Sequence, residues 1–103
     1  MKKLLSCDFD GVICKRSGIP TKEDWENDPP MEGARDAIKY LMDQGYEVYV
    51  QTANDLRRVK HWLRVNRFPK MDVTHSKKKG TIAYFDDRAI RFTNWNDIRK
   101  YFV

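Results

Sequence analysis

Two carboxylates follow a short apolar run near the beginning of the chain. Asp8 and Asp10 lie in the segment Lys3–Val12, KLLSCDFDGV, whose apolar residues suit a buried parallel strand. Gly11 allows the backbone to leave that strand sharply. Because side chains alternate along a strand, residues 8 and 10 lie on the same side and can converge on one ligand. The carboxyl ends of strands in open α/β sheets are where ligands bind, and one phosphate and one cation would fit here.

Three further polar groups follow in the order of the chain. Thr52 comes after the apolar run Tyr46–Val50, a lysine run covers Lys77–Lys79, and Asp86 and Asp87 end the segment TIAYF. With DFDGV, this order resembles the haloacid dehalogenase (HAD) superfamily. Its members are mostly phosphatases that act through a phosphorylated aspartate. The resemblance spans nearly the whole chain.

The resemblance implies a role for each acid. Asp8 would be the nucleophile that takes the phosphoryl group, and Asp10 would protonate the leaving oxygen and then activate water. Asp8, Asp86 and Asp87, with the backbone carbonyl of Asp10, would hold the metal ion. Oxygen ligands without a His or Cys cluster indicate a hard cation, which makes Mg²⁺ the expected cofactor. The alternative for the Asp86–Asp87 pair is a turn that holds Arg88. We favour the metal site, because two acids at the end of a buried strand cost stability unless another group compensates their charge.

The expected substrate-binding residues are Thr52, Ala53, Arg88 and one lysine. The Thr52 hydroxyl would donate to a phosphoryl oxygen, although a local turn bond is nearly as plausible for this residue taken alone. A salt bridge within its loop is the alternative for Arg88. Alignment on Asp86 with small relatives selects Lys78 as the catalytic lysine, with Lys77 close behind.

The pattern of apolar residues predicts the elements that carry these groups. We expect a single-domain three-layer α/β sandwich with a mainly parallel five-stranded sheet and no cap domain, and the resemblance implies the strand order 5-4-1-2-3. A short flap at about residues 13–30 contains Trp25, which either covers the site or pins the loop to the body. After the first strand, the expected elements are a helix over Met31–Gln44, a strand at Tyr46–Val50, a helix from Asn54 or Asp55 to Pro69, a short strand at Met71–Thr74, a strand at Thr81–Phe85, a short strand at Ile90–Phe92, and a helix capped by Asn94.

Composition limits the class of protein. The 103 residues contain 20 Lys and Arg against 15 Asp and Glu, so the formal charge of +5 favours anionic partners. No apolar run approaches the roughly twenty residues of a membrane span, and we expect a cytoplasmic protein with Cys7 and Cys14 as reduced thiols. Its expected partner is a phosphorylated substrate and not a membrane.

The leading prediction is therefore a Mg²⁺-dependent phosphomonoester hydrolase. Its substrate is either a small phosphorylated metabolite or a nucleotide or nucleic-acid end. The second possibility rests on a basic stripe along one predicted helix, for which a solvated helix face is the alternative; the stripe comprises Arg57, Lys60, Arg64 and Arg67. A phosphotransferase and a noncatalytic domain that binds anions or nucleic acid are the alternative functions.

Overall fold

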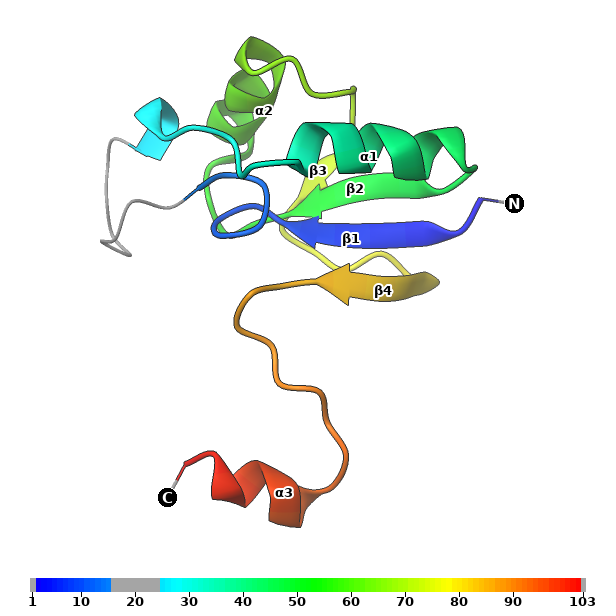
Figure 1. Ribbon diagram of the computed structural model, residues 1–103, viewed down its shortest axis with the longest axis vertical. Helices are drawn as coiled ribbons and strands as arrows, with labels where there is room; N and C mark the ends of the chain where they lie inside the picture. Colours follow the sequence, from blue (N-terminus) through cyan, green and yellow to red (C-terminus); the bar gives the residue numbers. More distant parts are fainter. Residues whose placement is uncertain (1, 16–24, 103) are drawn as a thin grey trace.

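A parallel sheet of four strands organises the chain (Figure 1). The structure is a computed structural model and describes residues 2–15 and 25–102. The strand order is β3-β2-β1-β4, so β1 pairs with β2 on one side and with β4 on the other. This is the expected order for the four strands that form. Their bounds are β1 Leu4–Asp8, β2 Glu47–Gln51, β3 Val73–Thr74 and β4 Thr81–Phe85.

Two helices cover one face of this sheet. α1 spans Ala34–Asp43 and α2 spans Leu56–Val65, and their apolar sides share one buried cluster with the odd-numbered residues of β1 and the even-numbered residues of β2. Asp55 caps α2, because its carboxylate accepts a hydrogen bond from the backbone N–H of Arg58. α2 ends at Val65, before Pro69 is reached. Within the part of the chain that the structure describes, no helix is both long and apolar enough to cross a bilayer.

Aromatic rings fill the core beside the site. Phe9, the residue between the two motif acids, is fully buried and packs edge-on against Trp25 and Trp62, with ring centroids 5.3 and 5.0 Å away. Trp25 begins a short 3₁₀ helix, η1 (Trp25–Asn27), and the guanidinium of Arg58 lies 4.9 Å above its ring. Trp25 therefore pins the loop to the body, the second of the two roles considered for it. Residues 16–24 of the expected flap lie outside the described residues.

The end of the chain departs from the expected sandwich. The predicted fifth strand at Ile90–Phe92 is wrong, because the sheet has four strands and the chain after β4 leads away from it (Figure 1). A strand needs a neighbour for its backbone hydrogen bonds, and this segment has left the edge of β4. α3 (Trp95–Lys100) does form, capped by Asn94 as predicted.

α3 does not complete a third layer. It makes no close contact with the other helices and strands of the described chain, and Trp95 and Phe102 remain 72% and 75% exposed. The expected third layer is therefore absent from residues 2–15 and 25–102. The side of the sheet at β4 therefore stays open to solvent, and Tyr84 and Phe85 of this strand are exposed.

Candidate active site

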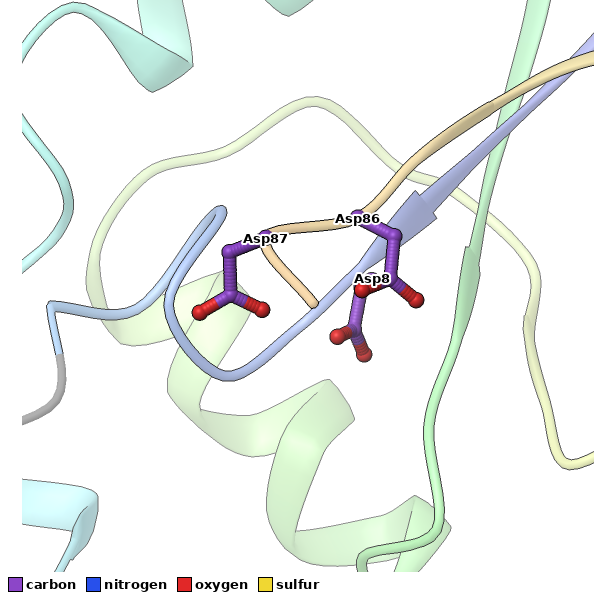
Figure 2. A group of neighbouring side chains, drawn as sticks. All are labelled: Asp8, Asp86 and Asp87. Carbon is purple, nitrogen blue, oxygen red and sulfur yellow. The ribbon is translucent and has the colours of Figure 1, made fainter. Parts of the chain in front are cut away.

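Three carboxylates meet where two neighbouring strands end (Figure 2). Asp8 is the last residue of β1, and Asp86 and Asp87 directly follow β4. Because β1 and β4 are parallel and Cys7 pairs with Phe85, their carboxyl ends lie side by side. One oxygen from each of the three acids lies within 4.8 Å of the others. The chain thus brings together side chains that are separated by 78 residues, from position 8 to position 86.

The environment of Asp8 disfavours its negative charge. Burial raises the pKa of Asp8 above its ordinary value, and the charges of Asp86, Asp10 and Asp87 raise it further. The backbone N–H of Phe9, which donates to Asp8 Oδ1 at 2.8 Å, opposes this shift in part. A cation placed among the carboxylates would therefore relieve both desolvation and repulsion.

Asp10 lies beside this cluster and not in it. Its Oδ2 accepts a hydrogen bond of 2.8 Å from Nδ2 of Asn54, which lies in the turn before α2. The sequence indicates Asn54 only as one of two candidate caps for this helix, and Asp55 is the cap. The amide of Asn54 instead orients the predicted acid and base, a contact between residues 44 positions apart.

A cavity of about 730 Å³ opens next to the carboxylates. Among the predicted site residues, its walls include Asp8, Thr52, Ala53 and Asp86. Asp10, Asp87, Lys78 and Arg88 do not line it. Six further residues of the wall were not among the predicted site residues: Ser6, Gln51, His75, Tyr84, Phe85 and Ala89.

Thr52 is buried with its side chain at the cavity. Its Oγ1 accepts a hydrogen bond of 3.0 Å from the backbone N–H of Asn54, which is the local turn bond considered in the sequence analysis. A hydroxyl that accepts a bond still has its own hydrogen to donate, so both roles are compatible. His75 Nδ1 lies 2.7 Å from the carbonyl oxygen of Thr52. Since a carbonyl can only accept, Nδ1 carries the hydrogen and fixes the turn after β2.

The two candidate lysines point to different partners. Lys78 Nζ lies 2.6 Å from Asp72 Oδ2 and 5.0 Å from the centre of the Tyr49 ring. Lys77 lines the cavity, with its Nζ 5.2 Å from the centre of the Tyr84 ring. The geometry favours Lys77, the second choice of the sequence analysis, over Lys78.

The loop after β4 is turned by Asp86. Its Oδ1 accepts a hydrogen bond of 2.8 Å from the backbone N–H of Arg88, which directs the chain away from the sheet. The structure thus gives the backbone of Arg88 a role in this turn. A substrate contact of its side chain stays a prediction.

Comparisons with known proteins give one structural likeness. No family model matches the sequence, and no curated protein sequence is significantly similar to it. The chain is similar in structure to the N-terminal part of the protein BF1531 from Bacteroides fragilis, which contains a phosphatase domain and was crystallised in complex with Mg. The TM-score is 0.50 at 19% identity, over 97% of this chain and 26% of that one. At this identity the likeness supports the fold, and the chain spans about a quarter of the length of its neighbour.

Proposed function

We propose that this protein is a Mg²⁺-dependent phosphomonoester hydrolase that acts through an aspartyl-phosphate on Asp8. The observation that carries the proposal is the convergence of three carboxylates, from Asp8, Asp86 and Asp87. They lie beside a cavity whose walls include Asp8, Asp86, Thr52 and Lys77. The likeness to the fold of a phosphatase domain supports it. On this proposal residues 1–103 form one HAD-type catalytic domain.

The three acids have the chemistry of a magnesium site, and their spacing is close to the one that the ion requires. Mg²⁺ binds oxygen ligands at about 2.0–2.1 Å, so its ligands lie at most about 4.2 Å apart. The carboxylate oxygens of Asp8, Asp86 and Asp87 are already within 4.8 Å of one another, and small rotations would close the difference. Bound there, the ion would neutralise charge on the phosphate and the carboxylates and so allow one anion to approach another.

The residues around the ion would then carry the reaction. An oxygen of Asp8 attacks phosphorus while the bond from phosphorus to the leaving oxygen breaks, and Asp10 gives that oxygen a proton. Asp10 next takes a proton from water, whose oxygen attacks phosphorus and releases Asp8 and inorganic phosphate. The amide of Asn54 holds Asp10 in the orientation that both proton transfers need.

The phosphoryl oxygens need donors as well as the ion. Thr52 would donate its hydroxyl hydrogen, and Ala53, which lines the same cavity, would offer its backbone N–H. Lys77 replaces Lys78 in our assignment of the charge-balancing lysine, because it lines the cavity while Lys78 pairs with Asp72. These groups would strengthen their contacts as charge develops on the transferring group.

The direct test is hydrolysis of p-nitrophenyl phosphate with and without Mg²⁺. Activity should require Mg²⁺, disappear with excess EDTA, and be abolished by Asp8→Asn. Asp43→Asn is the matched control, because Asp43 is an exposed acid at the end of α1, far along the chain from the cluster. Wild-type turnover by Asp8→Asn, or full activity in excess chelator, would contradict the proposal.

Calcium gives a second, independent readout of the same site. Ca²⁺ accepts more ligands at longer distances, so it can engage both oxygens of Asp8 and block the line of attack. We expect Ca²⁺ to inhibit the Mg²⁺-dependent activity competitively. Full activity with Ca²⁺ replacing Mg²⁺ would count against Asp8 as both ligand and nucleophile.

A further inference from the structure

A second cavity, of about 500 Å³, lies between α2 and the segment that leads into β3. Three cationic side chains line it, Lys60 and Arg64 from α2 and Lys70 from the following segment. Its apolar walls are Leu63, Phe68, Pro69 and Met71. We call this cavity the α2 groove. Its volume is within the range of pockets that bind small ligands or single nucleotides.

The α2 groove carries an excess of positive charge. Asp72 is the acid among its lining residues, and it already binds the ammonium group of Lys78 at 2.6 Å. The pKa of Asp72 is lowered chiefly by its hydrogen bond and charge interaction with Lys78, and the charges of Lys60 and Lys70 lower it further. Lys60 and Arg64 are four residues apart on one helix, where like charges repel. An anion in the groove would relieve that repulsion.

The α2 groove and the catalytic cavity lie at the two ends of β3. Asp72 precedes this strand and belongs to the groove, while His75 follows it and belongs to the catalytic cavity. Three residues of extended chain span about 10 Å. These are residues of the two cavity walls, so one ligand that occupies both cavities must be at least about this long. A single phosphate is too short.

We propose that the α2 groove binds the nucleotides next to a phosphorylated end of single-stranded nucleic acid, whose terminal phosphate occupies the catalytic cavity. The inference rests on the proposed phosphatase function. Lys60, Arg64 and Lys70 contact the inner phosphates, and the partly exposed apolar side chains of Pro69 and Met71 receive the face of a base. The substrate class is thus an oligonucleotide end in preference to a small phosphate ester.

The structure divides the basic stripe that the sequence indicated. Lys60 and Arg64 line the α2 groove, whereas Arg57 and Arg67 do not. Arg67 has a positive φ of 62° beyond the end of α2. Lys70, which was outside the stripe, takes part in the groove instead. This division supplies variants that remove equal charge in the groove and outside it.

The test compares two triple variants with the wild type. The groove variant is Lys60→Gln, Arg64→Gln and Lys70→Gln, and the control is Lys39→Gln, Arg57→Gln and Arg67→Gln, with exposed cations outside the groove. The first measurement is kcat/KM for a single-stranded DNA of about eight nucleotides with a terminal phosphate. In the groove variant, we expect kcat/KM for the oligonucleotide to fall by a factor at least ten times larger than kcat/KM for p-nitrophenyl phosphate. The control triple should lose far less.

The second measurement does not depend on turnover. Each triple is combined with Asp8→Asn, and binding of the same oligonucleotide with a fluorescein at its other end is followed by anisotropy between about 50 and 200 mM salt. The slope of log K against log[salt] reports the number of phosphate contacts. If the groove makes three of them, this slope should be steeper by about 2 for Asp8→Asn alone than for Asp8→Asn combined with the groove changes.

The outcomes separate the two proposals. If p-nitrophenyl phosphate is not hydrolysed but the groove changes still flatten the salt dependence, the proposed function fails and groove binding stands. Equal losses in the two triples would overturn the inference, because overall charge would then explain binding. Competition by polyglutamate as strong as that by an oligonucleotide would also overturn it, in favour of an acidic protein segment.

Discussion

The carboxylate of Asp87 lies against the Cα atom of Gly11, and this contact joins the loop after β1 to the loop after β4. A β-carbon built on Gly11 would lie 2.8 Å from Cγ of Asp87 and nearer still to its Oδ2. Gly11 also has a positive φ of 80°. The glycine of the DFDGV motif thus turns the chain after the acids and leaves space for the third carboxylate of the cluster.

Gly11→Ala should therefore weaken metal binding as well as stability. The left-handed backbone costs a residue with a β-carbon about 1–2 kcal/mol, and the new methyl group must displace Asp87. We expect the Mg²⁺ concentration for half-maximal activity to rise roughly tenfold or more. Gly45→Ala is the control, since Gly45 has a φ of 96° and no other group near its added β-carbon. An equal effect of both changes on Mg²⁺ dependence would contradict the contact.

Asp8→Asn should stabilise the metal-free protein, increasingly so as pH rises above about 4, the ordinary pKa of an aspartate. Because the pKa of Asp8 is raised in the folded state, the native protein holds a proton there more readily than the unfolded chain. Its stability then falls as pH rises through the interval between the two pKa values. The amide variant has no such loss, so the difference in Tm should grow with pH in EDTA. A difference that does not change with pH would contradict the raised pKa.

Much of the fold could be predicted because its signals are local. Asp55 and Asn94 each cap a helix by accepting a bond from a backbone N–H three residues later. The apolar runs predict the four strands. The parallel pairing expected for them predicts the edge of the sheet at which Asp8 and Asp86 meet. The site followed from that topology, since neighbouring parallel strands end together.

The remaining features depend on contacts between distant parts of the chain. Asn94 starts α3 but cannot determine what that helix packs against. The bond from Asn54 to Asp10 joins two loops with no periodic pattern. Alignment on Asp86 selects Lys78 over Lys77, but it cannot foresee the ion pair that holds Lys78, because the partner Asp72 belongs to another segment.

Trp62→Ala and Trp95→Ala should differ sharply in their effect on folding. Trp62 is 2% exposed, packs against Phe9 and Phe68, and donates its Nε1–H to the carbonyl of Asp28 at 3.0 Å. Its removal should lower the free energy of unfolding by about 3–5 kcal/mol. Trp95 is 72% exposed, so Trp95→Ala should lower the free energy of unfolding by no more than about 0.5 kcal/mol. Urea denaturation measures both, and a large loss for Trp95→Ala would mean that α3 packs against the body.

Lys77→Ala and Lys78→Ala should separate catalysis from surface pairing. Lys77 lines the catalytic cavity, so its removal should lower kcat/KM for p-nitrophenyl phosphate roughly 100-fold or more. Lys78 is held by the exposed carboxylate of Asp72, a type of ion pair that contributes about 0–1 kcal/mol. Lys78→Ala should therefore retain most activity. Asp72→Asn removes the same ion pair from its other side, so it should change stability by the same small amount as Lys78→Ala. If Lys78→Ala is the inactive variant, the alignment on Asp86 identified the catalytic lysine correctly and the cavity assignment is wrong.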